Sequence, residues 1–433
     1  MTALLEPPIW ALDPDDEELP TFPDDDLDLV FVEAALDRLL ASAGAGRTAP
    51  ESIDRIRRIK TQLNRLDAAL HDTAHDFART HVAARLDTAG AQAAETLDPD
   101  KLEQSVAAQI ALACRTSVHH GRTRIRVARD LHNGFDHLHT LFLAGELDAD
   151  KVSAIVTAAD TLSRAQRAEL DRRLAEHDLT RLGIGRLRDL TRRLVAEIAP
   201  ADFAKRCEAA KNTRRVTVRP AADGMAFLTA YLPVEQAVGC VAALDKAHRD
   251  LSASPEPLPR TRGQVMADTL VERLTGKTHA TDIDLHVQVI VPVEALIDPE
   301  SPLPAEIPGY GPVPADLLAT NKGRTTLRRL ITRKGIVIGG DTRQRRFTRF
   351  LDELIRARTR NRCTEAYCDA PIRHIDHITR AADHGTTTLD QGRGTCEFHN
   401  YLREQPGWKV EHTPDGVTTT TPTGHTYPNA PPG

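Results

Sequence analysis

Four residues near the C-terminus carry side chains that bind zinc in proteins. They form two pairs, Cys363-x4-Cys368 and Cys396-x2-His399, with 27 residues between the pairs. A tetrahedral zinc ion takes four sulfur and nitrogen ligands of this kind, which two tight turns of the chain can supply. The stretch between the pairs has few large apolar residues, so a small element there needs the metal to fold. We therefore predict a structural Zn²⁺ ion bound by these four residues.

The segment around these pairs resembles the HNH, or ββα-metal, nuclease superfamily. Asp376-His377 lies between the pairs and Asn400 directly follows the last one, which is the order found in members with paired zinc knuckles. The resemblance implies that Asp376 and Asn400 bind a divalent metal ion and that His377 is the general base. It also implies a strand, a loop, a second strand and a helix around that ion.

The wider chain is similar to an actinobacterial family in which a helical domain of unknown function precedes an HNH endonuclease. The similarity covers nearly the whole chain after residue 28 and gives no role to the helical domain. The segments that carry it are CDAPIRHIDH, CEFHNYLREQPGW, ADGMAFLTAYLP, RTRGQVMADTLVERL and PAEIPGYGPVPADLL.

The chemistry of these residue types agrees with the hydrolysis of a phosphodiester. A neutral imidazole such as that of His377 can take a proton from the attacking water. A divalent cation balances the charge on the phosphate and on the departing oxygen. The oxygens of Asp376 and Asn400 suit Mg²⁺ or Mn²⁺ rather than a second zinc ion. On a strand, Asp376 and His377 point to opposite faces, so one reaches the cation and the other the water.

One residue departs from the superfamily pattern, because Gln391 aligns with the middle Asn that braces the loop and orients the base. Two functions therefore stay open. The first is an HNH endonuclease that hydrolyses phosphodiester bonds in DNA. The second is a catalytically weak or inactive zinc-stabilised protein that binds DNA or regulates it. RNA and branched nucleic acid also stay open as substrates.

The charge of the chain is unevenly distributed, although the net charge is only −6. Residues 1–30 contain ten acids and no Lys or Arg, whereas residues 322–362 contain fourteen Lys or Arg and three acids. A basic stretch of this kind binds phosphates without reading sequence. A solvated linker helix is the alternative interpretation. The predicted substrate contacts are Arg360, Arg362, Gln391 and Arg403, the last on the helix face that carries Asn400.

The composition and periodicity predict a mainly α fold with a small β component, in which a helical N-terminal domain precedes a C-terminal ββα-metal (HNH) module containing zinc. We expect a disordered acidic tail at residues 1–27 and a helical domain of unknown function at 28–320. A basic linker or helix follows at 321–359, then the HNH module at 360–412 and a tail at 413–433.

A few local patterns within the helical domain are specific enough to test. Apolar residues recur at threes and fours over 52–78, and Asp148 and Asp150 are both placed to cap a helix that begins near Val152. Residues 215–231 alternate about a turn and predict a hairpin, and residues 286–293 predict a strand. Residues 302–314 are rich in Pro and Gly and predict a loop.

Three other residues with metal-binding side chains are not predicted to bind a metal ion. His132, His137 and His139 fall close together, but helical spacing puts only some of them on one face and no carboxylate pair accompanies them. We interpret them as surface or packing residues. The chain has no apolar run long enough for a membrane helix and no basic, apolar leader after Met1, so we expect a cytoplasmic protein without a membrane partner. Its oligomeric state is not predicted.

Overall fold

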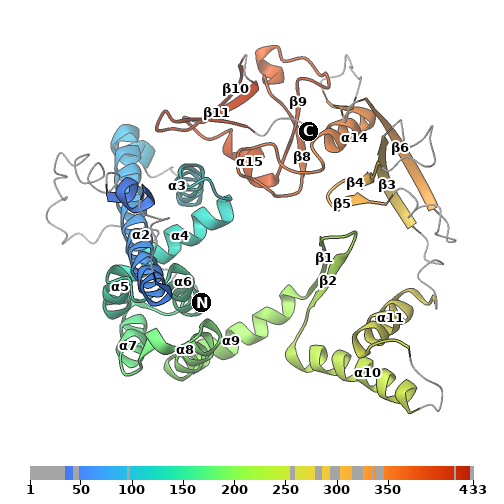
Figure 1. The fold of residues 1–433 in the computed structure, drawn as a ribbon. Coiled ribbons are helices and arrows are strands. Elements are labelled where there is room, and N and C mark those ends of the chain that lie inside the picture. The colour runs from blue at the N-terminus through green and yellow to red at the C-terminus, as the bar shows by residue number, and fades with distance from the viewer. Residues whose placement is uncertain are drawn as a thin grey trace. The chain divides into compact units, whose positions relative to one another are not determined.

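The computed structural model describes residues 35–41, 48–94, 98–253, 259–277, 285–292, 303–314, 325–333, 336–337, 346–413 and 416–429. The expected acidic tail, residues 1–27, and part of the basic stretch lie outside the described residues. The described part is mainly helical with small sheets, as predicted (Figure 1). Contacts divide the chain into two units, Met1–Cys114 with Val118–Phe203, and Ala204–Gly433 with Arg115–Ser117. The predicted helical domain of residues 28–320 is thus shared between both units.

The described part of the first unit consists of helices. The long helix α2 (Ala49–Ala94) includes the predicted periodic segment 52–78, and it packs against α3, α4 and α5. None of the described helices is both long enough and apolar enough to span a membrane. The remaining helices are α3 (Pro99–Ala113), α4 (Val118–Leu131), α5 (Asp136–Leu143), α6 (Ala149–Ala158), α7 (Arg164–Leu174) and α8 (Ile184–Ile198).

Local signals in the sequence explain where these helices begin and which faces they bury. Asp148 caps α6 as predicted, because its Oδ1 accepts a hydrogen bond of 2.8 Å from the backbone N–H of Lys151. Ser163 and Gln166 form a capping box at the start of α7. Phe135, the residue before α5, and Phe142, within it, are fully buried in the core of this unit.

The second unit begins with helices and a hairpin. Helix α9 (Pro200–Ala210) crosses the boundary between the units and leads to β1 (Arg215–Pro220), which pairs antiparallel with β2 (Ala226–Tyr231). The turn between the strands contains Gly224 at φ 69°, a conformation that favours glycine. The predicted hairpin is confirmed. Helices α10 (Val234–Ser252) and α11 (Arg262–Thr275) then pack against each other.

A five-stranded sheet follows in the order β5-β4-β3-β6-β7. Strand β3 (Leu285–Pro292) confirms the predicted strand and pairs parallel with β6 (Thr325–Arg333), while β7 is Ile336–Val337. The expected loop at residues 302–314 is wrong, because it contains the antiparallel strands β4 (Ala305–Ile307) and β5 (Gly311–Val313). Strands β6 and β7 also place part of the predicted basic linker in a sheet.

The C-terminal part of this unit holds the candidate site. Helix α14 (Arg349–Arg358) precedes the antiparallel strands β8 (His374–His377) and β9 (Gly392–Thr395), and helix α15 (Glu397–Leu402) follows. The expected tail after residue 412 differs from the structure, because this region forms most of a three-stranded sheet. Its strands are β10 (Lys409–Thr413), β11 (Gly416–Thr420) and β12 (Thr426–Pro428).

Two glycines in β9 let its neighbours approach closely. A Cβ added at Gly392 would lie 2.3 Å from Ile355 Cδ1 of α14, and one added at Gly394 would lie 2.2 Å from Ile372 Cδ1. Because real Cβ atoms do not approach this closely, a side chain at either position would force these neighbours to shift. The hairpin is therefore packed directly onto α14, whose Leu351 and Ile355 are fully buried.

Candidate metal centre and the adjoining hairpin

Cys363, Cys368, Cys396 and His399, which we call the Cys–His cluster, come together as the spacing predicts. Their ligand atoms all lie within 4.8 Å of one another. His399 Nδ1 is 3.5 Å from Cys363 Sγ and 3.3 Å from Cys396 Sγ, and Cys368 Sγ is 4.0 Å from Cys396 Sγ. A tetrahedral zinc ion separates its sulfur and nitrogen ligands by about 3.5–3.8 Å. The cluster can hold a metal ion, and its dimensions fit zinc.

Two turns of the backbone present these ligands. The first turn is closed by a hydrogen bond of 2.9 Å from the N–H of Cys363 to the carbonyl of Ala370. The second is the start of α15, where Cys396 is the N-cap and its sulfur accepts a hydrogen bond of 3.5 Å from the N–H of His399. A helix N-terminus favours a negatively charged group, so this position suits a thiolate.

The ionisation of the Cys–His cluster is coupled. Hydrogen bonds from Cys363 and Cys368 hold the pKa of the Cys396 thiol well below its ordinary value, and His399 adds to this effect. Burial lowers the pKa of His399, but hydrogen bonds with Cys368 and Cys396 and the charge of Glu365 raise it to about 10. These contacts favour the thiolate form of Cys396, which is the form of cysteine that binds metal ions.

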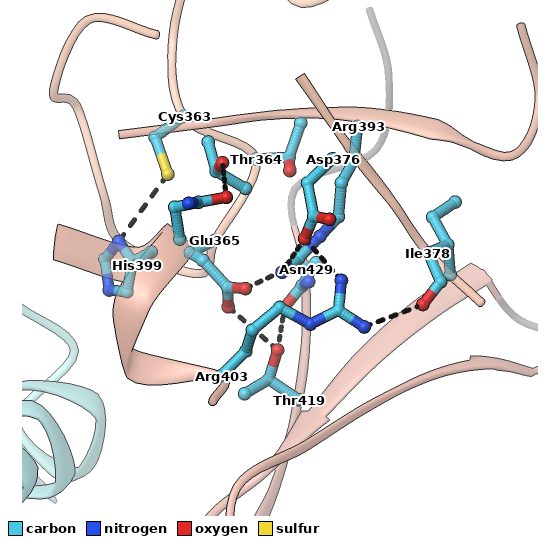
Figure 2. Close-up of polar contacts among 12 residues, drawn as sticks. Cys363, Thr364, Glu365, Asp376, Ile378, Arg393, His399, Arg403, Thr419 and Asn429 are labelled. Carbon is cyan, nitrogen blue, oxygen red and sulfur yellow. Dashed lines mark hydrogen bonds and ion pairs between the residues drawn. The ribbon is translucent and has the colours of Figure 1, made fainter. Parts of the chain in front are cut away.

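A buried ion pair that the sequence analysis missed lies next to the cluster (Figure 2). Glu365 and Arg393 are only 5% and 3% exposed, and Arg393 Nη1 donates a hydrogen bond to Glu365 Oε1. Thr419 of β11 donates to the second carboxylate oxygen at 2.8 Å. Burial opposes the charge of Glu365, yet the charge of Arg393 holds the pKa of that carboxyl below its ordinary value. The loop of Cys363, strand β9 and strand β11 are thus tied together.

The hairpin presents Asp376 and His377 to opposite sides. In the register of β8 and β9, Asp376 lies opposite Arg393 and His377 lies opposite Gly392. Asp376 Oδ2 accordingly accepts a hydrogen bond of 3.4 Å from Arg393 Nη2. His377 is on the face that packs on α14, where its ring centroid lies 4.5 Å from that of Phe347.

Arg403, which the sequence predicted as a substrate contact, is directed into the protein. Its side chain is buried, and it donates hydrogen bonds through Nη1 to Asp376 Oδ2 and to the carbonyl of His377. Its Nη2 donates to the carbonyl of Ile378 at 3.1 Å. A guanidinium with these partners holds the end of β8 in place. Figure 2 shows it directed at Asp376 rather than away from the protein.

His377 is half-buried and has its own polar partner. Its Nε2 lies 3.0 Å from Thr387 Oγ1, and its backbone N–H donates to Asp376 Oδ1 at 2.8 Å. Thr387 is buried and Phe347 packs against the ring, so both residues restrict how the imidazole turns. Neither residue was predicted, because no spacing in the sequence connects them to His377.

The remaining predicted residues lie near the hairpin but have different surroundings. Asn400 is half-buried, and its Oδ1 accepts a hydrogen bond of 3.4 Å from Thr395 Oγ1, which places it on the Asp376 side of the hairpin. Gln391 closes the hairpin, since its carbonyl accepts a hydrogen bond of 2.9 Å from Ile378. Its buried Oε1 has no hydrogen-bond partner among the described residues.

Arg360 and Arg362 lie on the surface at the end of α14. Arg360 Nε is 3.4 Å from Glu306 Oε1, and Arg362 Nη1 donates to the carbonyl of Asp369 at 3.2 Å. Both side chains are about half or more exposed, so these weak partners leave them accessible to a phosphate. Of the predicted substrate contacts, these two are the exposed ones.

Comparison with known proteins identifies one family. The model of a domain of unknown function, DUF222, matches residues 57–358, which is more than half of the chain. No curated protein and no solved structure matches the chain. The matched region ends at the last residue of α14, before the Cys–His cluster and the β8–β9 hairpin. The chain belongs to the DUF222 family.

Proposed function

We propose that this protein is an HNH-type endonuclease that hydrolyses phosphodiester bonds in DNA. The observation that carries the proposal is the placement of His377, Asp376 and Asn400. The first two lie on adjacent positions of β8, and Asn400 lies on the helix that follows β9. The order β8, β9 and α15 is the order of a ββα-metal module. The Cys–His cluster, with zinc bound, would fasten the hairpin to the helix.

His377 is the general base of this proposal. Its imidazole is held by Thr387 and Phe347 on one side of the hairpin, and its backbone N–H is held by Asp376. A side chain restricted in this way keeps its nitrogen in place while a water molecule approaches the phosphate. Removal of such a base typically slows a reaction by about 10²- to 10⁴-fold.

Asp376 and Asn400 are the residues that would hold a divalent cation. A carboxylate offers about four lone-pair positions, and Asp376 uses three of them for Arg393, Arg403 and the backbone N–H of His377. One position of the carboxylate is therefore left for a cation, and a hard oxygen from Asp376 with the amide oxygen of Asn400 fits Mg²⁺ or Mn²⁺. When bound, the cation would stabilise the charge on the phosphate and on the departing oxygen.

A second function is favoured by the same arginines. Two guanidinium groups already compensate the charge of Asp376, which reduces the need for a cation at this position. A zinc-stabilised protein that binds DNA without cutting it would have this arrangement. In both functions the exposed Arg360 and Arg362 contribute contacts to the phosphate backbone.

Cleavage and binding must be measured on the same protein to separate the two functions. The full chain is incubated with supercoiled plasmid and Mg²⁺ or Mn²⁺, and binding to a labelled duplex is followed by fluorescence anisotropy. The endonuclease predicts nicking that falls at least 10²-fold in His377→Ala with binding unchanged. The control is His384→Asn, an exposed loop residue at φ 65°, where asparagine is tolerated.

The outcomes are distinct. If the protein binds the duplex but nicks the plasmid with neither Mg²⁺ nor Mn²⁺, the non-cleaving function is supported. Equal nicking by the wild type and His377→Ala rejects the proposed base, and the absence of both binding and nicking rejects both functions. Elemental analysis of the purified chain for zinc tests the Cys–His cluster separately.

A further inference from the structure

A second group of metal-binding side chains lies in the first unit, within the residues that match the DUF222 family. Asp72 of α2 meets His132, directly after α4, and His139 of α5, which follow it by 60 and 67 residues in the chain. His132 Nε2 lies 3.1 Å from Asp72 Oδ1. His139 Nε2 lies 2.9 Å from the same oxygen and 3.2 Å from Oδ2. Figure 1 shows the three helices side by side.

We propose that Asp72, His132 and His139 form a binding site for one divalent transition-metal ion. Their ligand atoms all lie within 4.8 Å of one another, and the two nitrogens converge on one carboxylate oxygen. Neighbouring ligands of an octahedral ion with bonds of about 2.1 Å are about 3.0 Å apart, and those of a tetrahedral ion about 3.3 Å apart. The observed separations of 2.9–3.2 Å match this range.

The scaffold holds the three ligands rigidly. His132 and His139 each follow a fully buried leucine, Leu131 and Leu138, in the core of the unit. Both oxygens of Asp171 accept hydrogen bonds, of 2.7 Å and 3.0 Å, from the first turn of α5, which fixes the direction of that helix. A site on packed helices keeps its ligands in place without a metal, as a binding site requires.

The site is open to solvent and has a further imidazole beside it. The side chains of Asp72, His132 and His139 are 29%, 35% and 18% exposed, so a bound ion would keep positions for water or another ligand. The ring of His75, one turn after Asp72, stacks on His132 with centroids 4.3 Å apart. An open site with three protein ligands is the pattern of catalytic or exchangeable metals, in contrast to the closed Cys–His cluster.

The ligand types indicate which ions fit. Two imidazoles with one carboxylate favour Zn²⁺, Co²⁺, Fe²⁺, Ni²⁺ or Mn²⁺, and they disfavour Mg²⁺ and Ca²⁺, which take oxygen ligands. The sequence analysis missed this site because the carboxylate comes from α2, far from the histidines in the chain. It also grouped His137 with them, although His137 is not part of this set.

The alternative is a hydrogen-bonded network in which both imidazoles simply donate to Asp72. A titration of the full chain with Co²⁺ separates the two, after one equivalent of zinc has loaded the thiolates of the Cys–His cluster and excess Mg²⁺ has been added to occupy the oxygens of Asp376 and Asn400. Binding is followed by calorimetry and by the visible spectrum, since cobalt bound to thiolates has a sulfur charge-transfer band that a nitrogen and oxygen site lacks. Zinc binds more tightly than cobalt at most sites and stays in the cluster.

The wild type should take up one equivalent of Co²⁺ beyond the zinc, without the sulfur band. The double variant His132→Ala, His139→Ala should take up none, and the matched control His137→Ala should bind as the wild type does. Asp72→Asn keeps an oxygen that accepts hydrogen bonds, so it preserves a network, but it should weaken Co²⁺ binding at least ten-fold. This variant serves if the double variant does not fold by circular dichroism.

Two results would overturn the proposal. One is a zinc-loaded wild type that takes up no further Co²⁺. The other is an additional equivalent that binds equally well to the double variant or to Asp72→Asn. Because the titration reads metal in the first unit, its failure leaves the proposed endonuclease untouched, and the reverse also holds.

Discussion

The buried pair of Glu365 and Arg393 provides a test of how the C-terminal part is held together. Glu365→Gln removes the charge of one partner with little change of shape. Arg393 then keeps its charge in a buried position, where its nearest remaining acid is Asp376 at 3.4 Å. We expect the free energy of unfolding of this part to fall by about 3–5 kcal/mol, because a buried charge without its partner is strongly destabilising.

Within that range we expect a loss of about 3 kcal/mol in the free energy of unfolding. Asp376 still compensates part of the charge of Arg393, and glutamine still offers an oxygen to Thr419, which donates to Glu365 at 2.8 Å. A double variant Glu365→Leu, Arg393→Met should recover much of the loss, since replacing both charges by apolar groups is often close to neutral. The coupling between the two single changes is then at least about 1 kcal/mol.

The assay must report on this part of the chain alone, because a chain with two units does not unfold in a single step. Trp408 is buried in the C-terminal part, and the other tryptophan is Trp10. In a Trp10→Phe background, urea unfolding followed by fluorescence at fixed free zinc therefore reports on Trp408 only. The matched control is Glu404→Gln, an exposed acid 3.3 Å from Arg380, which should cost less than about 1 kcal/mol.

If Glu365→Gln and Glu404→Gln lowered the free energy of unfolding equally, the expected cost of leaving Arg393 buried without its partner would be refuted. The buried pair would then contribute no more than a surface pair, and the C-terminal part would depend on its metal and its packing alone. A large loss that the double variant does not recover would point instead to the hydrogen bonds of Glu365.

Three further changes test other parts of the fold. Gly392→Ala places a Cβ against α14 and should cost about 1–3 kcal/mol by Trp408 fluorescence, and an unchanged unfolding curve would contradict this close packing. Cys396→Ser, or chelation of zinc, should unfold the C-terminal part while the helical signal of the first unit in circular dichroism persists; retained Trp408 fluorescence would contradict this. Asp148→Ala should lower the melting temperature of the first unit through loss of about 1 kcal/mol at the cap of α6, and an unchanged melting curve would reject the cap.

Local patterns in the sequence predicted much of the fold. The periodic segment of α2, the cap at Asp148, the hairpin of β1 and β2 and strand β3 all depend on residues near one another in the chain. The loop expected at residues 302–314 was wrong because Ala305–Ile307 and Gly311–Val313 form two strands of three residues each between its Pro and Gly residues. Strands this short depend on pairing with each other and, for β4, with β3, which local propensity does not contain.

In the candidate site, too, the residues in local patterns could be predicted and those placed by distant contacts could not. The Cys–His cluster was predictable, since each ligand pair is local and only the meeting of two pairs had to be assumed. Glu365, Arg393 and Thr387 were not, because their partners lie 10 to 54 residues away. Arg403 was predicted as a substrate contact on the face of α15 that carries Asn400, but the carbonyls at the end of β8 lie within its reach and accept its hydrogen bonds. Tertiary contacts decided its direction.

These contacts connect the Cys–His cluster to the candidate catalytic residues. Arg393 bonds both to Glu365, in the loop that carries two of the cysteines, and to Asp376 on β8. Arg403 follows the helix that carries His399 and bonds to the same carboxylate. Asp376 is therefore held by the guanidinium of Arg393, which also contacts the loop of the first two cysteines, and by that of Arg403, which follows the helix of His399. If the cluster binds zinc as we propose, loss of that ion should loosen both segments, so the proposed nuclease activity should disappear even though no residue of the candidate catalytic set has changed.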